Sequence, residues 1–133
     1  APTQKPDVVF NTIHGTPGED GYLQAYLSLI NIPQTSAPFY QAALSFNKRD
    51  CLSVLKNAGI ICAKSYYLTK GDAIPHKEII ETVGLPCFVK PNRAGSSFGI
   101  SKVSNSEELD SAIHKAYQEV LIFYIYFLFH YLS

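Results

Sequence analysis

The chain has 133 residues, a formal net charge of zero at pH 7 and an apolar content of 47%. This size fits one or two small globular units. The neutral charge balance gives no electrostatic reason to expect a nucleic acid or an anionic membrane surface as a partner. We therefore expect no nucleic acid partner. No membrane span is expected either, because the apolar run over residues 123–133 is too short to cross a bilayer as a helix.

The cysteines give no sign of a disulfide framework or a zinc site. Cys51, Cys62 and Cys87 are an odd number without C-x-x-C spacing, and each stands among apolar residues. We expect them to be reduced thiols in the core. Residues 1–6 carry no apolar signal-peptide region, so a cytoplasmic location is the simplest expectation.

The first elements are a strand, a polar loop and a helix. Residues 7–10 are predicted to form a short buried strand that leads to His14. The following loop holds three glycines and the two carboxylates Glu19 and Asp20, which stand where acidic side chains commonly cap a helix or complement its dipole. The helix is predicted from an apolar stripe at i, i+3, i+4 and i+7, made by Leu23, Tyr26, Leu27 and Ile30.

Two further helices are predicted in the middle of the chain. Pro38 is placed to open a short helix over residues 39–46. Residues 47–58 form the next, and Gly59 ends it in the left-handed conformation. Lys48 falls in the first turn, where the helix dipole mildly disfavours a cation, so an ordinary surface lysine is the plain interpretation.

The second half alternates strands and helices. Residues 60–68 are rich in β-branched and aromatic residues and predict a strand, and residues 75–83 predict a short helix that ends at Gly84. Residues 87–90 predict a buried strand. This β-α-β order indicates a fold class between α/β and α+β.

A capping box is predicted where the last helix begins. Ser104 and Glu107 have the spacing of that motif. The helix after it is expected to bury one apolar face, which consists of Leu109, Ala112, Ile113, Ala116 and Tyr117.

The stretch C-F-V-K-P-N-R-A-G-S-S-F-G-I-S-K-V, residues 87–103, predicts a phosphate-binding strand, loop and strand. Lys90 stands where the first strand ends, and Pro91 is expected to stop that strand. Gly95, Ser96 and Ser97 can turn backbone N–H groups and two hydroxyls toward an anion. Most Gly/Ser loops bind nothing, however, and neither G-x-x-x-x-G-K-[ST] nor G-x-G-x-x-G occurs in the chain.

Three motifs together resemble one family. G-L-P-C-F-V-K-P-N-R-A-G-S-S-F-G-I-S-K-V, residues 84–103, closely resembles the ATP-grasp segment of D-alanine-D-alanine ligases. H-G-T-P-G-E-D-G-Y-L-Q, residues 14–24, is similar to the signature H-G-x-x-G-E-D-G-x-[LI]-Q of these ligases. A-A-L-S-F-N-K, residues 42–48, matches their A-S-A-L-[AS]-M-D-K stretch with small substitutions. The motifs follow in the order of the family, and the resemblance covers residues 7–122.

The resemblance implies two domains and a foreign tail. Residues 1–40 would be part of a Rossmann-like substrate domain, and residues 41–122 the first part of an ATP-grasp domain. Residues 123–133 would be an atypical apolar tail. The boundary near residues 35–47 follows from the resemblance more than from composition.

The resemblance also implies an activity and its residues. These ligases join two D-alanine molecules through an acyl phosphate, with ATP and Mg²⁺, to make a peptidoglycan precursor. The ATP-binding residues would be Lys48, Lys90, Gly95, Ser96 and Ser97, with both lysines facing the phosphates. The residues at the D-alanine cleft would be His14, Glu19, Asp20 and Ser96, and the catalytic residues His14, Ser96 and Ser97. A homodimer is also compatible with this family.

The end of the chain departs from the family. Residues 119–122 fit its E-V-L-I strand, but the next position, normally a glutamate that binds the nucleotide, is Phe123. Residues 123–133, FYIYFLFHYLS, resemble nothing in the family and are too short to cross a bilayer core of ~30 Å as a helix. A frameshift, a truncation, a substituted tail and burial as a long strand remain open.

The expected Mg²⁺ ligands lie outside this chain, so it would be a fragment with little or no turnover alone. Two alternatives stay open. One is a non-catalytic nucleotide-binding or interaction module, and the other is a different ATP-grasp ligase such as a D-alanine-D-lactate ligase.

Overall fold

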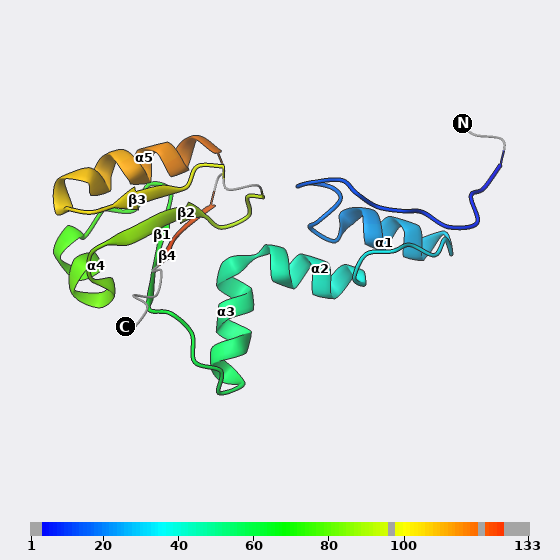
Figure 1. The fold of residues 1–133 in the computed structure, drawn as a ribbon, viewed down its shortest axis with the longest axis horizontal. Coiled ribbons are helices and arrows are strands. Elements are labelled where there is room, and N and C mark those ends of the chain that lie inside the picture. Colours follow the sequence, from blue (N-terminus) through cyan, green and yellow to red (C-terminus); the bar gives the residue numbers. More distant parts are fainter. Residues whose placement is uncertain (1–3, 96–97, 120–121, 127–133) are drawn as a thin grey trace. The chain divides into compact units, whose positions relative to one another are not determined.

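The computed structural model describes residues 4–95, 98–119 and 122–126. The chain divides into two units, Ala1–Asn47 and Lys48–Ser133, which are described separately below (Figure 1). Helices and strands mix in one chain, as expected for α/β to α+β. The domain boundaries implied by the resemblance stay a prediction.

The first unit holds α1 (Tyr22–Leu29) and α2 (Phe39–Phe46). The predicted buried strand over residues 7–10 is wrong, because the structure has only one parallel bridge there, between Val9 and Gln34. Val8 and Phe10 are 58% and 77% exposed. A single bridge creates no sheet face that could cover alternate side chains, which accounts for their exposure.

Helix α1 is confirmed, and its predicted apolar stripe is confirmed for buried Leu27 and half-buried Leu23 but wrong for Tyr26 and Ile30. Its buried residues are Gln24 and Leu27, whereas Tyr26 is 59% exposed and Ile30 follows the last turn as the C-cap. The start of α1 lies close to α2: a Cβ at Gly21 would come within 2.6 Å of the Phe39 carbonyl oxygen. The position therefore needs glycine, both for space and for its φ of +93°.

The second unit begins with α3 (Lys48–Asn57) and contains a sheet with the strand order β1-β4-β2-β3, in which every pair is antiparallel (Figure 1). The strands are β1 (Ser65–Thr69), β2 (Cys87–Pro91), β3 (Ser101–Val103) and β4 (Ile122–Tyr126). The remaining helices are α4 (His76–Val83), the short 3-10 helix η1 (Ser106–Glu108) and α5 (Leu109–Glu119).

Part of the atypical tail is a strand. Residues 123–126 continue β4, which pairs with β1 on one side and with β2 on the other. The expected strand over residues 119–122 is wrong for Glu119, which is the last residue of α5. The backbone of residues 123–126 is thus that of a paired strand, the burial of the tail stays a prediction, and residues 127–133 lie outside the described residues.

Helices α4 and α5 cover one face of the sheet. Ile79 and Val83 of α4 and four residues of α5 pack with alternate strand residues in one buried cluster. The cluster consists of Leu68, Ile79, Val83, Cys87, Val89, Val103, Leu109, Ala112, Ile113 and Ala116. Partly buried Tyr117 packs against it, so the predicted apolar face of α5 is confirmed.

Burial along β2 alternates. Cys87, Val89 and Pro91 are buried, whereas Phe88 and Lys90 are half-buried. Successive side chains of a strand point to opposite faces, so Phe88 does not belong to the core with Val89, contrary to the predicted buried run. Pro91 is expected to follow the strand, but it is the last residue of β2. At this position β2 pairs with β4 and not with β3, so the N–H that proline lacks is not needed.

Two element starts differ from the predictions. The strand predicted from residue 60 begins only at Ser65, and Ile60 and Ile61 are 51% and 90% exposed. At the last helix, the Ser104 N–H donates to the Glu108 carboxylate at 2.7 Å instead of to Glu107. The 3-10 turn η1 precedes α5. With this turn, the carboxylate that accepts the Ser104 N–H belongs to Glu108, one residue later than predicted.

The predicted stop at Gly59 is confirmed. Its φ is +80°, its N–H donates to the Lys56 carbonyl, and the Ile60 N–H donates to the Leu55 carbonyl, both at 3.0 Å. This pair of bonds is a Schellman motif. Among the described residues, no helix is long and apolar enough to cross a membrane.

Of the three cysteines, only Cys87 is buried. Cys51 and Cys62 are half-buried, so the expectation of three core thiols is wrong for these two. Burial raises the pKa of the Cys87 thiol to about 11. Because this thiol stays neutral at physiological pH, it acts as a small apolar core residue.

Candidate functional site

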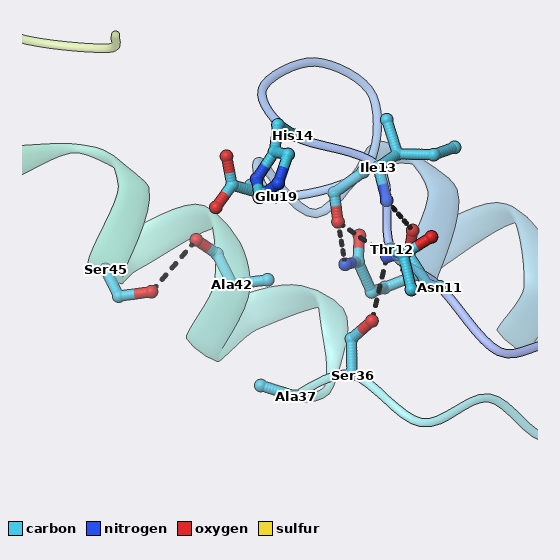
Figure 2. Close-up of a pocket in the computed structure, with 11 residues that line it drawn as sticks. Asn11, Thr12, Ile13, His14, Glu19, Ser36, Ala37, Ala42 and Ser45 are labelled. Atoms are coloured by element: carbon cyan, nitrogen blue, oxygen red, sulfur yellow. Dashed lines mark hydrogen bonds between the residues drawn. The ribbon is translucent and has the colours of Figure 1, made fainter. Parts of the chain in front are cut away.

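The first unit contains a hollow of about 530 Å³ beside the loop that carries the H-G-T-P-G-E-D-G motif (Figure 2). The loop supplies His14, Gly18 and Glu19 to its wall, and α2 supplies Ala42 and Ser45. The other lining residues are Asn11, Thr12, Ile13, Gln24, Ser36 and Ala37.

Asn11 organises one wall of the hollow. Its Oδ1 accepts the Ile13 N–H at 3.1 Å, and its Nδ2 donates to the Gly18 carbonyl at 2.7 Å and to Ser36 Oγ at 2.8 Å. Figure 2 shows Asn11 reaching both the loop and Ser36. One amide thus joins the loop to Ser36, which is 25 positions from Asn11 in the sequence.

The loop is closed by its own two carboxylates. Glu19 Oε2 accepts the Gly15 N–H at 2.5 Å, and Asp20 Oδ2 accepts the Thr16 hydroxyl at 2.6 Å. Gly18 must be glycine, since a Cβ there would lie 2.4 Å from the Ile13 Cβ. The motif therefore has a conformational reason for its glycine and acidic positions, besides any chemistry.

The structure brings two of the three predicted cleft residues of this unit to the hollow. The His14 side chain is exposed and lines it together with Glu19. Asp20 is absent from the lining, and besides Thr16 it accepts the Tyr22 N–H at 3.4 Å. The hollow thus presents an imidazole and a carboxylate, which can face the carboxylate and the amine of a small zwitterion.

Sequence reasoning missed Gln24 as a lining residue, although it stands in the quoted motif. Gln24 is 3% exposed, and its Nε2 donates to the Gly18 carbonyl at 2.6 Å. Within the described part of the chain, its Oε1 is buried and has no hydrogen-bond partner. Buried polar atoms are usually hydrogen-bonded, so this oxygen is available to accept an N–H from a molecule in the hollow.

The second unit presents cations on the sheet face opposite α4 and α5. Lys90 shares that face with Phe88, and its Nζ lies 5.8 Å from the centroid of the Phe88 ring. Lys102 stands opposite Phe88 on β3 and is exposed. The guanidinium of Arg49, a residue of α3, lies 5.9 Å from the centroid of the Tyr67 ring on β1.

Lys48 comes to the end of β2, where Lys90 stands. Its Nζ donates to the carbonyl of Asn92 at 3.1 Å and to that of Ala94 at 3.0 Å. The two predicted phosphate lysines are 42 positions apart in sequence, and the fold brings Lys48 to the segment that directly follows Lys90. Charged donors gathered at one strand end are suited to an anion with several oxygens.

The predicted loop is described only in part. The Gly95 carbonyl accepts the Phe98 N–H at 3.2 Å. Ser96 and Ser97 lie outside the described residues. Over the described ranges, no group of three or more His, Cys, Asp or Glu side chains is placed to hold a metal ion.

The chain mixes helices and strands. A model of a known protein family matches a large part of its second unit. The model is described as "D-ala D-ala ligase C-terminus" and matches residues 54–122. Since this match covers more than half of the chain, the chain belongs to the D-alanine-D-alanine ligase family.

Curated relatives agree with that assignment. The chain is 66% identical over 113 residues to the D-alanine-D-alanine ligase of Flavobacterium johnsoniae and 62% identical to that of Christiangramia forsetii. Each match covers 85% of this chain and 35% of the relative. The chain therefore spans about a third of the length of these ligases.

Solved structures show the same likeness. The D-alanine-D-alanine ligase of Coxiella burnetii matches with a TM-score of 0.86 at 28% identity, covering 96% of this chain and 39% of that one. The VanG D-Ala:D-Ser ligase of Enterococcus faecalis matches with a TM-score of 0.85 at 36% identity, covering 96% and 37%.

Proposed function

We propose that this chain is part of an ATP-dependent ligase that joins two D-alanine molecules through an acyl phosphate. Its first unit would belong to a Rossmann-like substrate domain and its second to an ATP-grasp domain. The family membership supports the reaction class. The observation that carries the nucleotide assignment is the meeting of Lys48 with the segment that follows Lys90.

The cation-bearing end of β2 would hold the ATP phosphates. Lys48 and Lys90 supply charged donors, and Gly95, with Ser96 and Ser97, would close over the phosphates. Bound ATP supplies the phosphoryl group that activates the first D-alanine. The lysines would stabilise the negative charge that develops on the transferred group, since fixed charges act most strongly where water is excluded.

The hollow of the first unit would border the D-alanine site. His14 and Glu19 face it, and Asp20 would act there through the loop that it closes. The His14 imidazole can donate to a substrate carboxylate, and the Glu19 carboxylate can accept from an ammonium group. Mg²⁺ would be held by ligands outside this chain, as the resemblance to the ligase family implies.

The nucleotide assignment is tested by the affinity of the chain for MgATP, measured by calorimetry. Lys90→Ala removes a charged hydrogen bond worth about 1.5–3 kcal/mol, so the dissociation constant should rise roughly tenfold or more. Lys77→Ala is the matched control. Lys77 lies on α4, at the opposite sheet face, and its 88% exposed side chain makes a 3.8 Å ion pair with Glu81. Equal MgATP affinities of the Lys90→Ala and Lys77→Ala variants would refute the assignment of Lys90 to the ATP phosphates.

A second candidate is a ligase with another second substrate. The 36% identity with a D-Ala:D-Ser ligase favours keeping this candidate. D-Serine and D-lactate, offered as competitors of D-alanine to a full-length enzyme that carries this segment, would separate the candidates by product mass. A non-catalytic nucleotide-binding module would bind MgATP and form no product in any full-length context.

A further inference from the structure

Asn92 is a buried polar residue with an unusual set of contacts. It directly follows β2 and is 1% exposed. Its side-chain Oδ1 accepts the Arg49 N–H at 3.0 Å. Its main-chain oxygen accepts from Lys48 twice, from Nζ at 3.1 Å and from the backbone N–H at 3.5 Å.

These contacts make Asn92 a cap for α3. Lys48 and Arg49 are the first two residues of that helix, and the first N–H groups of a helix have no acceptor within it. Such groups are usually satisfied by a side chain just before the helix. The acceptor for the Arg49 N–H comes from a residue 43 positions further along the chain.

The cap joins the two places from which the phosphate lysines extend. Lys48 is the first residue of α3, and Lys90 stands two positions before Asn92 on β2. The bond from the Arg49 N–H to Asn92 Oδ1 is thus a side-chain contact between the start of α3 and the end of β2. Charge–charge attraction falls with distance, so the distance between the two ammonium groups determines how well both engage one polyphosphate.

We propose that Asn92 is a positioning residue for the nucleotide: its side-chain amide holds the start of α3 against the end of β2, so that Lys48 and Lys90 engage the same phosphate chain. Asn92 itself does not touch the nucleotide. The inference rests on the proposed function and adds to it a residue that acts through Lys48.

The first test is a double-mutant cycle on MgATP affinity. Asn92→Leu keeps the approximate size of the side chain and removes the acceptor. It should weaken binding about tenfold in the wild-type chain and less than twofold in the Lys48→Ala chain, because its effect passes through Lys48. Equal weakening in both backgrounds would overturn the proposal. If Asn92→Leu does not fold, as judged by circular dichroism, Asn92→Ser takes its place in the cycle.

The second test needs no nucleotide. Hydrogen exchange of the Arg49 amide, followed by NMR, should be at least fivefold faster in Asn92→Leu, and Asn92→Asp should restore the wild-type rate because it keeps an oxygen in the same place. An unchanged rate in Asn92→Leu would overturn the proposal.

The two proposals fail in distinguishable ways. Suppose that Lys90→Ala weakens MgATP binding, and that Asn92→Leu weakens it equally in the wild-type and the Lys48→Ala chains. Only the positioning role of Asn92 is then refuted. If the wild-type chain takes up no MgATP, or if Lys90→Ala binds it as tightly as wild type, the nucleotide assignment is refuted and the role of Asn92 with it.

Discussion

Ile79→Ala tests whether α4 and α5 close one core over the sheet. Ile79 is fully buried, at 0% exposure, in the cluster that joins α4, α5 and the strands. Replacing a buried isoleucine by alanine costs about 2–5 kcal/mol, from lost apolar burial and from the cavity that remains. Small domains are stable by only about 5–15 kcal/mol, so this one substitution should remove a large share of the stability.

The assay is urea unfolding followed by far-ultraviolet circular dichroism. With a slope of about 1–1.5 kcal/mol per molar urea for a unit of this size, the midpoint should fall by roughly 1.3 M or more. The control is Ile61→Ala, the same change at a side chain that is 90% exposed, and it should cost less than about 0.5 kcal/mol. A midpoint shift for Ile79→Ala no larger than that of the control would refute the described core.

Three further predictions concern the thiols and the hollow. Iodoacetamide at pH 8 should modify Cys51 and Cys62 in the native chain well before Cys87, and mass spectrometry of peptides would show equal rates if Cys87 were accessible. Because the folded pKa of Cys87 is about 11 and the ordinary value is 9.0, its contribution to stability is complete below pH 9 and is lost as the pH rises through 11. Urea midpoints should therefore fall less steeply over that range in Cys87→Ala than in wild type, and identical slopes would contradict the shift. In a full-length ligase carrying this segment, His14→Ala should raise the KM for D-alanine about tenfold with the KM for ATP unchanged, whereas an equal rise of both would place His14 elsewhere.

The sequence predicts best where local pattern and final burial coincide. The apolar face of α5 is confirmed because each member of the stripe faces the same sheet. The Gly59 stop is confirmed because a left-handed residue ends a helix by local hydrogen bonds alone.

The failures have a common physical cause, since burial depends on which segments are neighbours. The segment over residues 7–10 is apolar but has one bridging partner, so Phe10 stays exposed. Phe88 is apolar but alternates with Val89 and falls on the other sheet face. The apolar pattern of one segment does not show how many other segments pair with it, or which face of the sheet they cover.

The motifs predicted Lys48, Lys90, His14 and Glu19 as site residues, and their roles stay predictions. In the structure, the two lysines come to one strand end, and His14 and Glu19 line one hollow. The contacts of Asn92 with α3 could not be foreseen, because they join residues more than 40 positions apart and no local pattern encodes them.

The most direct test of the proposed function places this segment in a complete enzyme. Residues 7–122 would replace the corresponding segment of the Flavobacterium johnsoniae ligase, and D-alanine-dependent ADP release from MgATP would be measured. We expect release that requires D-alanine and falls at least tenfold on Lys90→Ala, while the 133-residue chain alone releases little or none. A folded chimera that binds MgATP but releases no ADP when D-alanine is added would contradict the assignment of this chain to a working ligase.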